Sequence, residues 1–319
     1  MQNFDILVVG ELNVDLILNK IQTFPKLGTE ILAKEMTLTL GSSSGIFACN
    51  ASALGARVAF LGKIGNDYFG SLIEDSLRSK NVNTDHIIRS SDYVTGATIA
   101  LSFDENRAMI THPGAMEYLS RENISCEILR TAKHLHVSSI FLQPLLKKDL
   151  CEVFKMAKDL GLTTSLDTQW DPLEQWDINL PKLLPLVDVF IPNQDEILAL
   201  TKQKNVFAAI DAIKKFSNII VVKMGNKGSV AHFQDQLFEV PSYLNSAVVD
   251  TIGAGDSFDA GFVSRFVKGR NLESCLKFAN LAGAINTTAA GGTTAFSSYE
   301  KIKETALRRF NVNILDVEN

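Results

Sequence analysis

One stretch decides both fold and chemistry: Asp250-Thr251-Ile252-Gly253-Ala254-Gly255-Asp256-Ser257-Phe258. Its glycines, Gly253 and Gly255, let the backbone turn tightly and bring bare N–H groups close to a ligand. The helix predicted to follow adds unpaired N–H donors and partial positive charge, which together favour an anion such as a transferring phosphoryl group. Asp256 supplies a carboxylate that can accept the proton of an attacking hydroxyl. The alternative is an ordinary helix cap at Asp256.

Outward from this stretch, the chain alternates between apolar runs and amphipathic segments. Such alternation predicts a parallel sheet with helices on both faces, and ligands bind at the carboxyl ends of such strands. The predicted strands are 6–9, 58–62, 134–138, 163–167, 187–191 and 219–223. The predicted helices are 43–54, 69–79, 255–267, 272–289 and 298–310.

Short, half-polar segments near the N-terminus predict a second, smaller sheet. Segments 14–18, 30–33 and 36–40 are β-prone and are separated by Pro25 and Gly28, which favours a small antiparallel sheet. Segments 97–103 and 107–111 flank the hairpin signal Asp104-Glu105-Asn106. We therefore predict one α/β domain over residues 1–319, with a β-sheet lid assembled from about 12–40 and 95–112.

Composition excludes several classes of protein. A formal net charge of −5 over 319 residues gives no sign of a nucleic-acid or membrane surface. The longest uncharged run, 278–299, is too polar to span a bilayer. The four cysteines form no C-x-x-C pair and indicate free thiols, so a cytoplasmic protein is expected.

The decisive stretch resembles the second signature of the ribokinase (PfkB) family of carbohydrate kinases, D-T-x-G-A-G-D. The first signature is similar to the segment from Gly41 to Gly70, and Asn193-Gln194-Asp195-Glu196 matches the family's N-x-x-E. Val222 to Gly228 resembles the nucleotide-side strand and turn. These motifs follow the family's order over nearly the whole chain. The resemblance implies a ribokinase-like fold and ATP-dependent phosphorylation of a hydroxyl on a small sugar-like acceptor.

The resemblance also implies roles for individual residues. Asp256 would be the base, and the N–H groups of Gly253, Ala254 and Gly255 would bind the γ-phosphoryl group. Glu196 would organise Mg²⁺ through water, together with Asn193. The residues implied for the acceptor are Asp15, Asn13, Gly41, Ser42, Asn50 and Arg107, and those implied for ATP are Asn193, Lys223, Gly225, Gly228, Asn280 and Gly283. A K⁺ ion would lie near the main-chain carbonyls of Asp250, Ile252 and Ala289.

Two departures from the family pattern bear on the acceptor. Ile46 stands where relatives often carry a polar residue, which removes a sugar contact. Asp171 lies where relatives that act on sugar acids tend to carry Arg, and an acid there would repel an anion. Arg107 and Lys34, in the lid, are the candidate partners for an anionic acceptor. We therefore expect neutral sugars to be preferred over sugar acids and sugar phosphates.

Other readings of the sequence remain open. A nucleoside kinase of the same family would need a broader aromatic pocket, for which Phe103, Phe141 and Trp170 are available. A sugar-binding regulator without catalysis is a second alternative, although the base and glycine turn are both retained. A nicotinamide-dependent oxidoreductase is disfavoured because 6–15 contains one glycine. Lid strands of the family often pair across a dimer, which suggests a homodimer.

Three histidines are further candidates for site residues. His134 and His136 alternate on a predicted strand and could suit a metal, but the sequence offers no third ligand. We therefore expect ordinary histidines of the core or the surface, with no metal role. His112, beside Pro113, could contact the acceptor from the lid.

Overall fold

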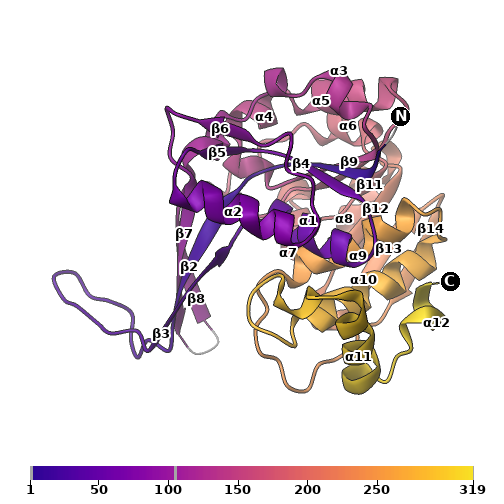
Figure 1. Cartoon of the computed structure of the whole chain (residues 1–319). Helices are drawn as coiled ribbons and strands as arrows, with labels where there is room; N and C mark the ends of the chain where they lie inside the picture. Colours follow the sequence, from indigo (N-terminus) through magenta and orange to yellow (C-terminus); the bar gives the residue numbers. More distant parts are fainter. Residues whose placement is uncertain (1–2, 104–105, 319) are drawn as a thin grey trace.

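The computed structural model describes residues 3–103 and 106–318, without the side chains of Ser102, Asn106, Arg107 and Glu318 (Figure 1). Within this part of the chain, the main sheet has eight strands in the order β14-β13-β12-β11-β10-β9-β1-β4. Their bounds are β1 Phe4–Val9, β4 Val58–Leu61, β9 Ala132–Ser138, β10 Thr163–Asp167, β11 Val189–Phe190, β12 Ile219–Lys223, β13 Ser229–Phe233 and β14 Gln236–Val240.

The six strands from β12 to β4 are parallel, whereas β13 and β14 add an antiparallel edge. Strands that run parallel and are covered on both faces need continuous apolar residues, which is what the sequence supplies. All six predicted core strands are therefore confirmed, with the one predicted at 187–191 shortened to Val189–Phe190.

Helices cover both faces of this sheet. One layer contains α1 Ser43–Ala53, α2 Tyr68–Ser79, α9 Ala254–Phe266, α10 Leu272–Asn286, α11 Tyr299–Phe310 and α12 Ile314–Glu318. The other contains α3 Cys126–Leu129, α4 Pro144–Lys148, α5 Leu150–Asp159, α6 Leu180–Leu183, α7 Gln194–Thr201 and α8 Val206–Ile213. The five predicted helices are all present, within three residues of their expected ends.

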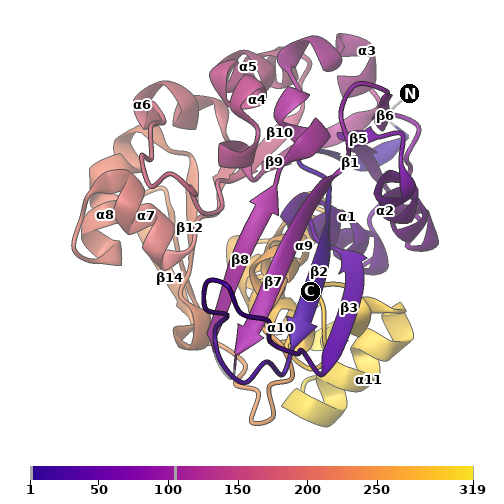
Figure 2. The same ribbon diagram turned by 90° about the vertical axis from the view of Figure 1, so that its left-hand side faces the viewer.

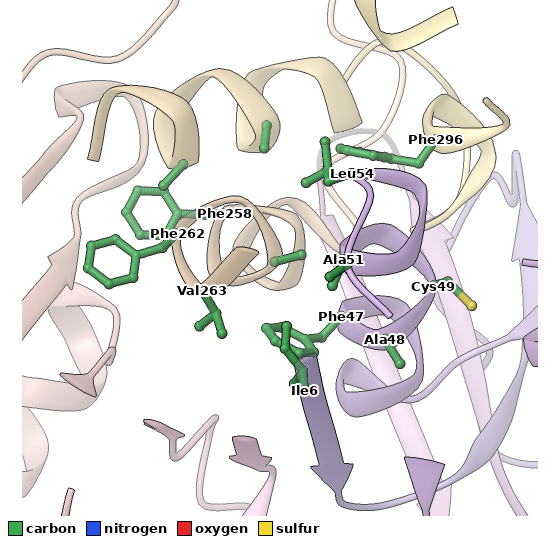
Figure 3. Packing of buried hydrophobic residues seen from close by; sticks show 14 of the residues in the cluster. Ile6, Phe47, Ala48, Cys49, Ala51, Leu54, Phe258, Phe262, Val263 and Phe296 are labelled. Carbon is green, nitrogen blue, oxygen red and sulfur yellow. The ribbon is translucent and has the colours of Figure 1, made fainter. Parts of the chain in front are cut away.

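Alternate residues of β1 point into the two helical layers. Ile6 belongs to the cluster formed with α1, α9 and α10, and Leu7 to the cluster formed with α3–α8. Figure 3 shows α1 packed beside α9, with Phe47 of α1 near Ile6 and Phe262 and Val263 on α9. The first turns of α1 and α9 are thereby fixed next to each other.

A second sheet of the order β3-β2-β7-β8 projects from the body of the molecule (Figures 1 and 2). Its strands are β2 Asn13–Asn19, β3 Glu35–Leu40, β7 Gly96–Phe103 and β8 Asn106–His112. A short parallel pair, β5 Lys63–Gly65 and β6 Ile88–Ser90, completes the strands of the described chain. Residues 104 and 105 of the predicted hairpin turn lie outside the described residues.

In three places the structure differs from what the β-prone residues of the sequence favour. Residues 30–33 belong to the loop between β2 and β3, where Leu32 is 81% exposed and has no face on which to pack. The small sheet is not wholly antiparallel, because β2 pairs with β7 in parallel. The β-prone residues 247–249, which directly precede the glycine stretch, form no strand, and Val248 and Val249 are both more than half exposed.

No described helix is both long enough and apolar enough to cross a bilayer. The carboxyl ends of the parallel strands meet at one edge of the main sheet, where Ser138 lies beside Asp167 and Val9 beside Leu61. The small sheet leaves the body from this same edge, because β2 begins four residues after β1 ends. This edge is where the topology predicts a ligand site.

Candidate active site

Gly253 makes the turn into α9 with a left-handed backbone, at a φ of 76°. A Cβ atom at this position would lie 2.6 Å from the Cα of Gly292. Both the backbone angle and the close approach require glycine. The predicted glycine turn is thus a feature of the structure, fixed against a second glycine almost forty residues downstream.

The helix start behind this turn presents N–H groups that have no intrahelical acceptor. One of the three predicted donors, the N–H of Ala254, lies 3.2 Å from the carbonyl oxygen of Thr251 and donates to it. Serving an anion would require Ala254 to give up this long bond. Gly255 opens onto the side chain of Lys223, whose Nζ would lie 3.7 Å from a Cβ there. A positive charge therefore stands beside the helix start.

Asp256 lies in the first turn of α9 and is 8% exposed. The Nε2 of Gln169 donates to its Oδ1 over 2.9 Å. Burial raises the pKa of Asp256 to about 6, opposed by the charge of Lys223 and assisted by that of Asp167. A carboxylate with such a pKa is ionised at neutral pH and can still take up a proton, as a general base must.

Two further acids surround Asp256 that the sequence analysis did not single out. Oxygen atoms of Asp167, Asp256 and Asp259 lie within 4.8 Å of one another. Lys223 donates to Asp167 Oδ2 over 2.9 Å and to Asp259 Oδ2 over 3.0 Å. Burial would lower the pKa of Lys223, but these carboxylates raise it above its ordinary value. Its ammonium group therefore supplies the positive charge that a bound cation would otherwise supply among the three acids.

The sequence contains signals that could have identified Asp167 and Asp259 as site residues. Asp167 is the last residue of a parallel strand, where ligand-binding residues collect. Asp259 follows Asp256 by three positions, so both lie on the same side of α9. Gln169 had no such signal, because nothing in its local sequence indicates contact with a residue 87 positions away.

Asn193 and Glu196 form a capping box at the start of α7. The Asn193 N–H donates to Glu196 Oε2 over 2.9 Å, and the Glu196 N–H donates to Asn193 Oδ1 over 2.9 Å. Glu196 is 1% exposed; burial, followed by the charge of Asp167, raises its pKa to about 8. Burial and a nearby carboxylate therefore both disfavour the ionised form of Glu196.

A cavity of about 300 Å³ opens beside this charged cluster. Of the residues predicted for ATP, five line it: Lys223, Gly225, Gly228, Asn280 and Gly283. Ala254 and Gly255 of the helix start also line it, which places the cavity next to the glycine turn. Its volume is at the lower end of the range for small-molecule sites. Asn193 is not among the lining residues.

The Asn280 amide is already used within the protein. Its Nδ2 donates to Ser229 Oγ over 3.0 Å and to the carbonyl oxygen of Val240 over 3.1 Å. Asn280 thus holds the cavity wall together. Gly283 lies close to the neighbouring helix: a Cβ there would be 3.2 Å from the carbonyl oxygen of Ala254.

Four predicted acceptor residues gather where the small sheet meets α1. Asn13 donates to Asp15 Oδ1 over 3.0 Å, and the Ser42 N–H donates to Asn13 Oδ1 over 2.9 Å. A Cβ at Gly41 would lie 2.2 Å from Asp15 Oδ1, so only glycine allows this approach. The structure therefore brings Asn13, Asp15, Gly41 and Ser42 together.

Asn50 lies apart from these four residues, so the structure contradicts the prediction that it contacts the acceptor. The residue is fully buried, and its Nδ2 donates to Ser257 Oγ and to the carbonyl oxygen of Gly292, each over 2.9 Å. These bonds join α1 to α9 and to the glycine segment behind Gly253. Asn50 holds the helices together and presents no surface to an acceptor.

The two departures from the family pattern also have structural explanations. Ile46 packs against the glycine turn: a Cβ at Gly253 would lie 3.1 Å from its Cγ2. Asp171 is buried and accepts three backbone N–H groups, from Leu173 and Gln175 over 2.9 Å and from Trp176 over 2.7 Å. Asp171 therefore shapes its own loop.

The remaining candidates fall into three groups. The backbone of Arg107 lies in β8, but its side chain is outside the described part of the chain. His112 is exposed at the end of β8, whereas His134 and His136 are buried and both bond to Ser165. This is the packed arrangement expected for core histidines.

The segment proposed for K⁺ is tied together around Asp250. Its Oδ1 accepts the N–H of Ile252 and its Oδ2 accepts the N–H of Gly291, both over 2.9 Å. The carbonyl oxygen of Ile252 accepts Nδ2 of Asn286 over 2.6 Å. Hydrogen bonds therefore join the turn at 250–252 to the stretch 286–291, in which Ala289 lies.

Transfer of a phosphoryl group to a hydroxyl needs a base beside an anion-binding backbone and room for the donor. The edge of this sheet holds a buried carboxylate, an open helix start and a cavity, which suit these needs, and the class of protein so defined is an ATP-dependent kinase that acts on an alcohol group. The model of the pfkB family carbohydrate kinases matches residues 3–298, and the chain belongs to that family.

Relatives with stated activities fit this family. Ribokinase of Arabidopsis thaliana is 30% identical over 88% of this chain and 75% of its own length. The 5-dehydro-2-deoxygluconokinase of Listeria innocua is 27% identical over 95% of each chain. A solved structure of the Arabidopsis ribokinase complexed with ribose and ATP has a TM-score of 0.82 at 26% identity and covers 95% of this chain and 98% of its own.

Proposed function

We propose that this kinase transfers the γ-phosphoryl group of ATP to a hydroxyl of a small neutral sugar, with Asp256 as general base. The single observation that carries the proposal is the position of the Asp256 carboxylate. It lies in the first turn of α9, next to the glycine turn and the cavity. An attacking hydroxyl, the anion hole and the donor can meet at this point.

In the proposed reaction, Asp256 accepts the proton of the acceptor hydroxyl as its oxygen attacks the γ-phosphorus. The bond from that phosphorus to the bridging oxygen breaks, and ADP leaves. Backbone N–H groups of Gly253, Ala254 and Gly255 stabilise the negative charge on the transferring group. Lys223, beside Gly255, adds positive charge at the donor side.

The cavity lined by Gly225, Gly228 and Gly283 is proposed to receive ATP, because its glycines let the ligand approach the backbone. Asn193 and Glu196 are proposed to organise Mg²⁺ through water. Their oxygen atoms are of the kind that this ion prefers, and a bound cation would favour the ionised form of Glu196, which burial disfavours. The ion would neutralise charge on the ATP phosphates.

A neutral acceptor is supported by the side chains gathered at the foot of the small sheet. Asp15 and Asn13 can bind hydroxyl groups, whereas a carboxylate repels an anionic acceptor at short range. The relatives include one named for ribose and one named for a sugar acid, so both classes belong in a test. Asp171 does not contribute to this preference, because backbone N–H groups occupy its carboxylate.

We further propose that the chain is one kinase domain and that the small sheet closes over the acceptor as a lid. Its strands expose Met36, Ile99 and Ile110, which share the face opposite Asp15 and are 69%, 41% and 67% exposed. An apolar surface of this kind suits pairing with a second copy of the chain. Ultracentrifugation should find a dimer that Ile110→Asp weakens, and a wild-type monomer at micromolar concentration would contradict this.

Two smaller proposals complete the account. A K⁺ ion held by the carbonyls of Asp250, Ile252 and Ala289 would order the turn, and kcat should be higher in KCl than in choline chloride; equal rates would rule it out. The free thiols of Cys49 and Cys275 are buried and suit a reducing cytoplasm. Cell fractionation checks that location, and recovery in another compartment would contradict it.

The test of the main proposal is ADP release with ATP and Mg²⁺ across a panel of acceptors. The panel should hold neutral sugars, sugar phosphates, 5-dehydro-2-deoxygluconate and nucleosides. The expected result is the highest kcat/KM for a neutral sugar. A preference for nucleosides would favour the nucleoside-kinase alternative, and no acceptor-dependent ADP release at all would refute the proposal.

A further inference from the structure

The loop after β10 has an unusual backbone. Three non-glycine residues within eight positions, Gln169, Glu174 and Trp176, have left-handed φ angles of 58°, 52° and 54°. Such conformations are unfavourable for residues with a Cβ and persist where the surrounding structure imposes them. Asp171 supplies part of that constraint by accepting three N–H groups of the loop.

The consequence of this loop shape is the position of the Gln169 side chain. Its Nε2 donates to Asp256 Oδ1 over 2.9 Å and to Asp167 Oδ2 over 2.6 Å. A side-chain amide nitrogen carries two hydrogens, so each carboxylate receives one. Gln169 is therefore an uncharged bridge between the base and the neighbouring acid.

The charges around Asp256 explain why such a bridge matters. The groups that face it are three acids and one base, namely Asp167, Asp259, Glu196 and Lys223. The ammonium of Lys223 donates to Asp167 and Asp259. The hydrogen bonds that reach Asp256 itself come from the neutral side chains of Ser43 and Gln169, and each lowers its pKa.

We propose that Gln169 is a positioning residue for phosphoryl transfer, which holds the Asp256 carboxylate between two other acids in the ionised form and orientation that deprotonate the acceptor. The inference rests on the proposed function of Asp256. The left-handed residues of the loop 168–179 would then serve to place the side chain of Gln169. Without the amide, the same carboxylate faces Asp167 with one donor fewer.

The first test compares Gln169→Met with wild type in kcat against pH. Methionine keeps the length of the side chain and removes its donors. The expected result is an upward displacement of the acidic limb by about 1 pH unit, so that kcat falls about fivefold more at pH 6 than at pH 8.5. The KM for ATP should stay within about twofold, since no ATP-side group is changed.

The matched control is Gln175→Met, an exposed residue of the same loop whose backbone N–H, and not its side chain, binds Asp171. This variant undergoes the same chemical change and should keep the wild-type pH profile. Gln169→Glu places a fourth carboxylate against Asp167 and Asp256 and should lose more activity than Gln169→Met. An unchanged acidic limb in Gln169→Met would overturn the inference.

A second measurement does not depend on turnover. In protein labelled with ¹³C at aspartate carboxyls, the Asp256 signal is identified by its loss in Asp256→Asn, and its titration midpoint is compared in wild type and Gln169→Met. A midpoint higher by about 1 unit supports the inference even if the acceptor is misassigned. Equal midpoints refute it, and they do so even if wild type is an active kinase that Asp256→Asn inactivates.

Discussion

At the scale of single residues, the ionised form of Asp256, the proposed base, costs stability. Its folded-state pKa of about 6 lies above the ordinary value of 3.8, so the folded protein binds this proton more tightly than the unfolded chain does. The contribution of Asp256 to the free energy of unfolding therefore falls as pH rises from about 4 to about 6, and stays low above that. Catalysis needs the ionised form, which is the less stable one.

Asp256→Asn should accordingly stabilise the fold at high pH. We expect the free energy of unfolding to rise by about 1–3 kcal/mol at pH 8, because a buried charge is removed while the acceptor for Gln169 remains. The gain should shrink toward zero near pH 4. Urea unfolding at the two pH values measures it. A variant less stable than wild type at pH 8 would contradict the electrostatic description of this site.

Asp15 provides a residue-scale test of the acceptor side. Asp15→Ala should raise the KM for the sugar by about 10- to 100-fold, the loss expected when hydrogen bonds to a charged group are removed. The KM for ATP should change little, because Asp15 lies beside Gly41 and Asn13, away from the cavity-lining residues. Steady-state kinetics with each substrate varied will check this. A rise confined to the KM for ATP would place Asp15 on the ATP side and would contradict its assignment to the acceptor.

At the scale of elements, the turn into α9 has the strictest requirements. Gly253→Ala should lower the free energy of unfolding by about 2–4 kcal/mol, because it combines a left-handed alanine with a clash against Gly292. We expect kcat to fall at least tenfold, since the anion-binding N–H groups move with the turn. Denaturant unfolding and kcat measure the two effects.

The control for that variant is Gly269→Ala, beyond the other end of α9. Gly269 has a similar φ of 72°, and among the described residues no heavy atom lies within 4 Å of the position its Cβ would take. It should show the backbone cost of about 1 kcal/mol and no change in kcat. If both variants lost activity equally, the glycine turn would have no special role in catalysis.

The start of α7 tests the proposed metal site. Glu196→Gln retains a side chain that can complete the capping box with Asn193, but removes the carboxyl group that can ionise when Mg²⁺ binds. The Mg²⁺ concentration needed for half-maximal activity should rise on the order of tenfold, while stability is kept. Asn193→Ala should instead lose about 1 kcal/mol of stability through the cap. An unchanged Mg²⁺ requirement in Glu196→Gln would assign the metal to other residues.

At the scale of the whole molecule, the layers of the fold could be predicted from sequence. Continuous apolar runs such as Ile6–Val9 identify buried parallel strands, and the glycine stretch identifies the helix start of α9. The errors were local. Leu32 and Val248 carry β-prone side chains that find no partner strand and lie exposed. The β-propensity of a segment describes the conformation that its residues favour, whereas strand pairing depends on residues that are distant in the sequence.

The site was predictable only in part for the same reason. The glycines, Asp256 and the acceptor acid lie in motifs that can be read along the chain. The bridge from Gln169 to Asp256 and the ion pairs from Lys223 to Asp167 and Asp259 join segments between 36 and 87 positions apart. Asn50 was misread because a polar residue in a signature can bind helices together as well as a ligand.

The most direct test of the central claim is the ratio of kcat values for wild type and Asp256→Asn, measured with the best acceptor and saturating ATP and Mg²⁺. Removal of a general base predicts a fall of about 10²–10⁴-fold, with the dissociation constant for ATP within about twofold of wild type. A variant that kept kcat within about threefold of wild type would contradict the assignment of Asp256 as the base.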